Sequence, residues 1–168
     1  MTLIRAATLA DWPYIESLRR KEWSALGFIP KGAYLSVLSG VPVDGRRRWE
    51  YQRLVVSEDN GDLTGFCYSS FAQQEAHIIQ MVVQEDARRW ARATLLEGDV
   101  MQRAVELGKC GVVCRVACDL ESNLYWLALG YTRIEAAFSE WRNQASKSGR
   151  LVWRYRRDLP LPLLGVEV

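Results

Sequence analysis

The sequence has a single histidine, His77, and none of its four cysteines stands in a C-x-x-C pair. Structural zinc sites need closely spaced cysteine and histidine ligands, so we expect no metal site. Three of the cysteines, Cys110, Cys114 and Cys118, recur in a β-branched run at a spacing that would place them on one face of a strand. The sequence therefore favours buried, reduced thiols there.

The sequence also lacks an apolar run near the ~20 residues that cross a bilayer, and its first residues show no signal-peptide pattern. We expect a cytoplasmic protein without membrane association. The net charge is only +2, so charge as a whole gives no argument for nucleic-acid binding. No internal repeat or linker is visible, and 168 residues predict one domain over residues 1–168.

Hydrophobic periodicity predicts an alternation of strands and helices. The strands are expected at residues 3–6, 49–57, 63–71, 77–84, 112–117, 131–141 and 151–157, and the helices at 8–27, 31–38, 88–107 and 122–129. Thr8 and Asp11 have the spacing of a capping box, and Asn60-Gly61 predicts a hairpin turn. A strand meander followed by a strand–helix–strand unit with parallel strands indicates an α+β fold.

The most informative stretch runs from His77 to Leu96, where a β-branched apolar run leads directly into a basic helix. The first amides of a helix have no intrahelical partners and carry the positive end of the helix dipole. A phosphate placed there gains several hydrogen bonds at once. The arginines at 88, 89 and 92 are positioned to reinforce such a site.

Within this stretch, residues 88–93 read R-x-x-A-x-A and are followed by Leu95 and Leu96. This pattern resembles the pyrophosphate loop of the GCN5-related N-acetyltransferase (GNAT) superfamily, Q/R-x-x-G-x-G/A. Ala91 replaces the usual first glycine, and we expect it to be tolerated if the backbone there is helical. A second segment, Asn123 to Tyr131, is similar to the family's closing motif, a short helix that ends in Leu-Gly-Phe.

The resemblance implies an α+β fold with a mixed central sheet of about six to seven strands, flanked by helices and splayed between its fourth and fifth strands. Acyl-CoA, such as acetyl-CoA, would occupy the opening and pair with free strand backbone. The cofactor contacts that it implies are Met81, Val82 and Val83, then Arg88, Arg89, Trp90, Ala91, Arg92, Ala93 and Thr94, and finally Asn123 and Trp126. Asn123 is also expected to cap the short helix.

The catalytic groups are open at this stage. In many members a tyrosine of the closing motif protonates the thiolate; that position holds Trp126, while Tyr125 is shifted by one residue. His77 opens the fourth strand, where the general base of this family often lies, and histidine titrates near neutral pH. Glu22 is the alternative base.

The acceptor is also open. The resemblance implies a primary amine, with a pocket built from the residues at 23, 28, 29, 30 and 34. Gly27 to Lys31 is weakly similar to phage and mobile-element proteins, including the Mom group that modifies adenine in DNA. The arginines at 46–48, 150, 154, 156 and 157, interleaved with Trp49, Tyr51, Trp153 and Tyr155, would serve such a nucleic-acid function. A third hypothesis is a non-catalytic acyl-CoA-binding module.

The end of the chain, residues 160–168, is apolar and contains prolines. Its leucines are difficult to bury on the predicted fold. We expect this segment to cover a sheet edge or to pack on a second subunit, as in a homodimer.

Overall fold

The computed structural model of the chain describes residues 1–42, 50–88, 91–139 and 150–160. Its strands are β1 (Thr2–Ala6), β2 (Gln52–Asp59), β3 (Asp62–Ser70), β4 (Glu75–Val83), β5 (Gly111–Ala117), β6 (Thr132–Ser139) and β7 (Arg150–Asp158). Its helices are η1 (Leu9–Asp11), α1 (Trp12–Lys21), α2 (Lys31–Ser39), η3 (Glu85–Ala87), α3 (Arg92–Glu106) and α4 (Ser122–Ala128).

The strands form one mixed sheet in the order β1-β2-β3-β4-β5-β7-β6. Neighbouring strands are antiparallel except β4 and β5, which are parallel and joined by the α3 crossover. The α+β prediction and the parallel strand–helix–strand unit are therefore confirmed. The Asn60-Gly61 hairpin is confirmed as well, since both residues have positive φ, 51° and 95°.

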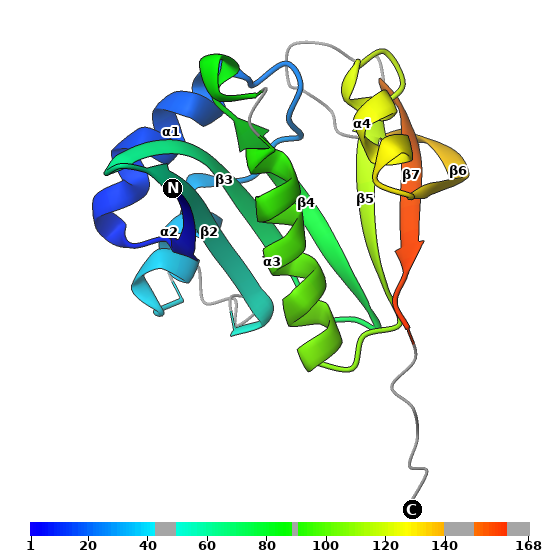
Figure 1. Ribbon diagram of the computed structural model, residues 1–168, viewed down its shortest axis with the longest axis horizontal. Helices are drawn as coiled ribbons and strands as arrows, with labels where there is room; N and C mark the ends of the chain where they lie inside the picture. The colour runs from blue at the N-terminus through cyan, green and yellow to red at the C-terminus, as the bar shows by residue number, and fades with distance from the viewer. Residues whose placement is uncertain (43–49, 89–90, 140–149, 161–168) are drawn as a thin grey trace, which may run out of the picture.

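The sheet opens into a fork between β4 and β5, as expected. The two strands pair only from Glu75 with Gly111 to Ile78 with Cys114. Beyond this point they diverge, and Figure 1 shows them meeting at their lower ends and separating toward the top. The later part of β4 therefore has no strand partner on the β5 side.

A bulge on β4 lies at the start of the fork. Tyr68 of β3 pairs with Gln80, and the next residue, Ser69, pairs with Ile78, so Ile79 is an extra residue in β4. A bulge bends its strand and increases its local twist, which directs the upper part of β4 away from β5.

Two hydrophobic cores lie on opposite faces of the sheet. On one face α3 and α4 pack over a cluster that includes Val112, Cys114 and Val116, and Figure 1 shows α3 in front of the strands. On the other face α1 and α2 pack over β2 and β3, around the fully buried Tyr34. None of the described helices is long and apolar enough to span a membrane.

Two helix boundaries differ from the prediction. The first helix ends at Lys21 rather than continuing to Gly27, and the residues from 22 to 30 form a loop, the α1–α2 loop. The third helix begins at Arg92 rather than Arg88, because the 3-10 turn η3 precedes it. The Thr8–Asp11 capping box is present, but it starts η1 instead of a longer helix.

The cysteines also differ from the expected arrangement. Only Cys114 of the predicted row lies within β5; Cys110 precedes the strand and Cys118 follows it. Cys67 and Cys114 are buried, the other two are half-exposed, and all four thiols are free.

Candidate functional site

The fork exposes strand backbone at Met81, Val82 and Val83. These residues pair with Cys67, Phe66 and Gly65 of β3, while their opposite side faces the opening. The Met81 and Val83 side chains join the core under α3, and Val82 joins the core under α1 and α2. The backbone here can therefore accept an extended, amide-rich ligand as an added strand would.

Above the fork, the N-terminus of α3 is open. Ala91 is the N-cap and has φ 57° and ψ 11°, which is a left-handed conformation. The expectation of a helical backbone at this residue is wrong, because α3 begins only at Arg92 and Ala91 is its left-handed N-cap. The first intrahelical bond is donated by Leu95 to the Ala91 carbonyl, so the amides of Ala93 and Thr94 have no partner within the helix.

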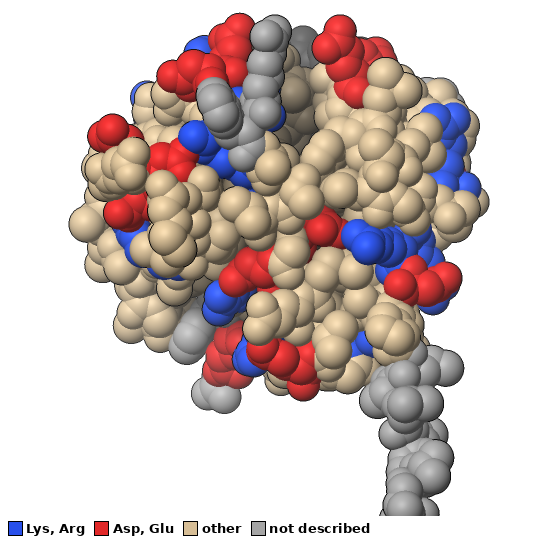
Figure 2. Space-filling view, viewed as in Figure 1, with Lys and Arg blue, Asp and Glu red and all other residues tan. Residues whose placement is uncertain are grey.

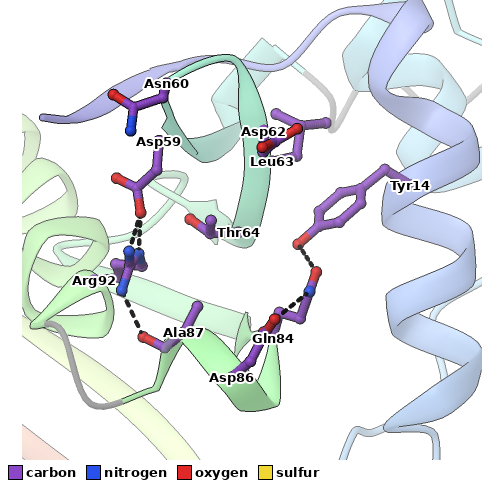
Figure 3. A pocket seen from close by; sticks show the side chains of 10 residues that line it. All are labelled: Tyr14, Asp59, Asn60, Asp62, Leu63, Thr64, Gln84, Asp86, Ala87 and Arg92. Carbon is purple, nitrogen blue, oxygen red and sulfur yellow. Dashed lines mark hydrogen bonds and ion pairs between the residues drawn. The ribbon is translucent and has the colours of Figure 1, made fainter.

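Two neighbouring arginines, Arg88 and Arg92, hold the segment before α3 by bonding to other parts of the protein. Arg88 donates to the Val83 carbonyl at 3.1 Å and to a Glu22 carboxylate oxygen at 2.6 Å. Arg92 forms an ion pair with Asp59 and donates to the Ala87 carbonyl, as Figure 3 shows. Of the remaining predicted cofactor contacts, Arg89 and Trp90 lie outside the described residues.

Beside this loop lies a hollow of about 600 Å³. Figure 3 shows Tyr14, Asp59, Asp62 and Asp86 around it, together with the bonds of Arg92 to Asp59 and Ala87. None of its lining residues comes from β5 or α4, so it is separate from the fork. Its carboxylates also make it a poor place for a phosphate.

On the other side of the opening, α4 carries the partly buried Tyr125 and the buried Trp126. Trp126 stacks edge-on against both Tyr125 and Tyr131 within the core. The Tyr125 hydroxyl is shielded from solvent beside Thr94 in the first turn of α3. Burial raises the pKa of Tyr125, so its hydroxyl keeps its proton.

Asn123 is buried, and its amide is used inside the protein. Its Nδ2 donates to the carbonyls of Ala117 at 2.9 Å and Leu120 at 2.6 Å, while its Oδ1 accepts from Tyr155 at 2.8 Å. The expectation that it caps α4 is wrong, since the N-cap is Glu121. Asn123 thus fixes the turn between β5 and α4.

His77 lies at the base of the fork. It pairs with Ser70 on one side and Val113 on the other, one residue before the strands part. The residue is half-buried; its Nε2 is shielded from solvent and has no hydrogen-bond partner among the described residues. Burial lowers the pKa of His77, opposed by Glu75 and assisted by nearby arginines, so the ring is neutral at pH 7.

Glu22, the alternative base, lies at the end of α1 and binds Arg88. Arg88 also bonds to the Val83 carbonyl at the far end of β4 from His77, so the structure does not bring Glu22 together with His77. The third candidate catalytic residue, Tyr125, lies above the fork, on α4.

Sequence reasoning missed the structural role of Gln80. This buried side chain accepts a hydrogen bond from Tyr34 of α2 and donates one to the Gly27 carbonyl at 2.5 Å. From the other half of the sheet, Arg150 donates to the Ser24 carbonyl and pairs with Asp119 at 2.8 Å. The α1–α2 loop is thus held from both arms of the fork. The sequence signal for this role of Gln80 is a polar residue within an otherwise apolar strand.

Only part of the predicted acceptor pocket is accessible. Trp23 and Phe28 are exposed on the α1–α2 loop, whereas Ile29 and Tyr34 are buried in the core. Pro30 is the exposed N-cap of α2. The two exposed aromatic side chains are therefore the pocket candidates that a ligand can reach.

The described arginines of the C-terminal cluster are paired with carboxylates rather than grouped as a cationic patch. Their partners are Asp119 for Arg150, Glu75 for Arg154 and Arg156, and Glu97 for Arg157. On the face shown in Figure 2, Lys and Arg side chains mostly lie beside Asp and Glu.

The aromatic residues of the nucleic-acid hypothesis do not form a stacking surface either. Tyr155 is fully buried, so it has no face for a base, and Trp153 packs against Arg133. Tyr51 is exposed, whereas Trp49 and residues 46–48 lie outside the described residues. No finding links the chain to the Mom group, and the described residues contain no cluster arranged to hold a metal ion.

No family model and no curated protein matches the chain in sequence. Solved structures resemble it across almost its whole length. The ribosomal-protein-S18-alanine N-acetyltransferase from Escherichia coli matches with a TM-score of 0.71 at 14% identity, over 100% of this chain and 99% of that one. NAA60 from Arabidopsis thaliana, in complex with a bisubstrate analogue, matches with a TM-score of 0.77 at 11% identity, over 96% and 100%.

A putative acetyltransferase, yncA from Salmonella typhimurium, was solved with its cofactor acetyl-CoA. It matches with a TM-score of 0.75 at 14% identity, over 100% of this chain and 99% of that one. Likeness at such identities defines a fold. Together with the fork, the parallel β4–β5 pair and the seven-stranded order, it shows that this chain has the fold of the GNAT N-acetyltransferases.

Proposed function

We propose that this protein transfers an acyl group from acyl-CoA to a primary amine. The observation that carries the proposal is the coincidence of two features at one place. The unpaired edge of β4 opens directly below the helix N-terminus whose amides at Ala93 and Thr94 lack intrahelical partners. The strand edge suits an amide-rich ligand arm, and the helix N-terminus suits a pyrophosphate.

The residues present fit acetyl-CoA. The backbone of Met81–Val83 would pair with the pantetheine arm, and the amides that follow Ala91 would hold the pyrophosphate. Bound acetyl-CoA supplies an activated thioester. Arg88 and Arg92 would act chiefly by fixing the loop, because their guanidinium groups are already bonded to Glu22 and Asp59.

Two side chains would accept and donate the protons, His77 at the base of the fork and Tyr125 above it. His77, neutral at pH 7, would accept the proton that the amine loses as it attacks. Tyr125, which stays protonated, would donate a hydrogen bond or a proton to the departing sulfur. We assign no proton transfer to Glu22, whose carboxylate binds Arg88.

Cofactor binding is tested by Ala91→Asp. Aspartate tolerates a left-handed backbone and is a favourable N-cap, so the fold should be retained. Its carboxylate would repel the pyrophosphate. We expect titration calorimetry to show acetyl-CoA binding at least about tenfold weaker, since like charges in such a site cost several kcal/mol.

Gln102→Glu is the matched control, because it adds the same charge on the exposed side of α3, remote from the loop. It should bind acetyl-CoA like the wild type. Undetectable binding of acetyl-CoA by the wild type at millimolar concentration would refute the proposal.

Turnover is tested with His77→Gln and Tyr125→Phe against a broad amine panel, by release of free CoA thiol. General-base catalysis typically contributes about 10²–10⁴-fold, so His77→Gln should lower kcat by that order. The wild-type rate should fall at acid pH as His77 gains a proton, and the variant should lose that dependence. Equal rates in wild type and variant would exclude His77 as the base.

The second candidate is a non-catalytic acyl-CoA-binding module. It is favoured by Trp126, which lies buried at the position where the resemblance implies a tyrosine acid. Acetyl-CoA binding without turnover of any amine in the panel would support this candidate over the enzyme.

A further inference from the structure

The β5–β7 part of the sheet has one face without a described helix over it. Val112, Cys114 and Val116 point into the core under α3 and α4, so the alternate residues Val113 and Arg115 point to the opposite face. On that opposite face α1 and α2 pack over β2 and β3. Arg115 is exposed there.

Arg115 is placed at the fork. The last β4–β5 pair joins Ile78 and Cys114, so Arg115 is the first residue of β5 beyond the pairing. His77 pairs with Val113 and therefore lies on the same face, diagonal to Arg115. The two side chains are close enough for the guanidinium to lower the pKa of the imidazole.

The position of this cation is unfavourable for stability. Arg115 stands directly opposite Arg154 on β7, and like charges at facing positions of a sheet destabilise it. Arg154 is compensated by Glu75 at 2.5 Å and by Glu135 at 3.9 Å. Arg156, the next arginine on β7, pairs with Glu75 and Asp158.

Arg115 itself makes no ion pair with any residue that the structure describes. The carboxylates of this face, Glu75, Glu135 and Asp158, are engaged by the arginines of β7. An exposed guanidinium therefore remains beside the neutral His77, at the point where the strands separate.

The helices determine the side from which an acceptor can approach the fork. Because α3 and α4 cover one face of the fork, an acceptor would approach from the face that carries His77 and Arg115, beside the α1–α2 loop that Gln80 and Arg150 hold there. We propose that Arg115 binds a carboxylate of the acceptor, so that the substrate is an amine with a carboxylate close to its nitrogen. A guanidinium holds a carboxylate with two parallel hydrogen bonds, which would orient the amine toward His77.

This inference rests on the proposed function and names its substrate class. A free amino acid supplies the carboxylate from its main chain, and a peptide supplies it from an acidic residue next to the amino terminus. The two sources share the chemistry and differ in the distance between nitrogen and carboxylate.

The test uses matched acceptor pairs: L-leucine and L-leucinamide, L-glutamate and its α-amide, and peptides that differ only in Asp or Asn as second residue. Wild-type kcat/KM should favour the carboxylate member of at least one pair. Arg115→Gln should reduce that preference about tenfold or more, as expected for a hydrogen bond to a charged group. Comparing the variant with the wild type cancels the different basicity of the paired amines.

Arg115→Lys should retain part of the preference, and affinity for acetyl-CoA should stay unchanged in both variants. Arg103→Gln is the control, since Arg103 is an exposed arginine on α3 that pairs with Glu106. It should leave every ratio as in the wild type. A preference that survives Arg115→Gln, or a wild type that acetylates both members equally, would overturn the inference.

A second arm separates this inference from the reaction itself. Calorimetry in the presence of CoA compares N-acetyl-leucine with N-acetyl-leucinamide, and N-acetylated Asp with Asn peptides, in wild type and Arg115→Gln. A carboxylate preference that depends on Arg115, without any turnover, would support the site and refute the proposed transfer. Absence of that preference in both arms would refute the site.

Discussion

Ala91 holds a backbone conformation that alanine disfavours. Its φ of 57° lies in the left-handed region, where the Cβ atom crowds the following carbonyl. Asn60 is the other described non-glycine residue with positive φ, and it belongs to a hairpin turn in which asparagine is common. The strain at Ala91 is consistent with a loop shaped for binding.

Replacing Ala91 with glycine should therefore stabilise the protein by about 0.5–1 kcal/mol, the left-handed penalty less the extra freedom of glycine in the unfolded chain. Urea unfolding measures the change. Ala93→Gly, two residues into α3, should instead destabilise by a similar amount. Destabilisation by Ala91→Gly would contradict the left-handed assignment.

Asp11 carries a stability that depends on pH. Its carboxylate accepts from Arg5 at 2.8 Å and from the Thr8 amide at 2.7 Å. The hydrogen bond from Arg5 is the main reason that the pKa of Asp11 falls to about 2. The stabilisation is therefore present above the ordinary aspartate pKa of 3.8 and is lost as the pH falls toward 2.

Asp11→Asn should lower the free energy of unfolding by about 2 kcal/mol at neutral pH and flatten its decline in acid. Chemical unfolding at a series of pH values checks this. Asp62→Asn, which removes an exposed carboxyl at the hairpin, serves as the control. An unchanged pH profile in Asp11→Asn would count against the assigned role.

At the scale of elements, the α1–α2 loop depends on one buried amide. Gln80 joins Tyr34 of α2 to the Gly27 carbonyl, directly above the bulge at Ile79. The loop that carries Trp23 and Phe28 is thereby fixed relative to the fork. If an acceptor contacts these aromatic side chains, its binding would depend on Gln80, because Gln80 fixes the loop that carries them.

Gln80→Leu should cost about 2–4 kcal/mol, because it leaves the Tyr34 hydroxyl and the Gly27 carbonyl without their partner. Amide hydrogen exchange over residues 23–29 should become faster, more than elsewhere in the protein. Gln102→Leu, on the exposed side of α3, should change stability by less than about 0.5 kcal/mol. Unaltered exchange in the loop would refute this role for Gln80.

Most elements could be predicted from the sequence because periodicity and turn residues are local properties. The Asn60-Gly61 hairpin and the parallel β4–β5 unit follow from such patterns. The start of α3 could not be predicted, because alanine and arginine both favour helix and only the tertiary structure places Ala91 in a left-handed turn.

The candidate site was predictable only in part. The strand edge and the helix N-terminus follow from the motifs, and the fork follows from the family resemblance. The partners of the arginines do not, because Asp59 and Glu22 lie far from Arg92 and Arg88 in sequence. The same holds for Arg115, whose significance depends on strand order and register.

At the scale of the whole molecule, the fork joins two parts of the sheet through a short ladder of β4–β5 pairs. A ligand in the fork would contact both parts and bind only the folded state. At a hundredfold excess over its Kd, acetyl-CoA should add about 2.7 kcal/mol to the stability.

For a chain of this size that stabilisation corresponds to a rise in Tm of about 5–10 °C. Differential scanning fluorimetry measures it, with adenosine as a control ligand that lacks the pyrophosphate and pantetheine groups. Ala91→Asp should reduce the shift. A Tm that does not respond to millimolar acetyl-CoA would argue against a folded binding site.

The bulge at Ile79 shifts the side-chain alternation of β4 by one residue. Below it the even-numbered residues Ala76 and Ile78 face α3; above it the odd-numbered Met81 and Val83 do. Deleting Ile79 would remove the bulge and leave Ile78, Met81 and Val83 facing α3 in one unbroken alternation, with the pairing to β3 preserved. An apolar substitution at this residue alters one side chain, whereas its deletion would remove the bend that directs the upper part of β4 away from β5.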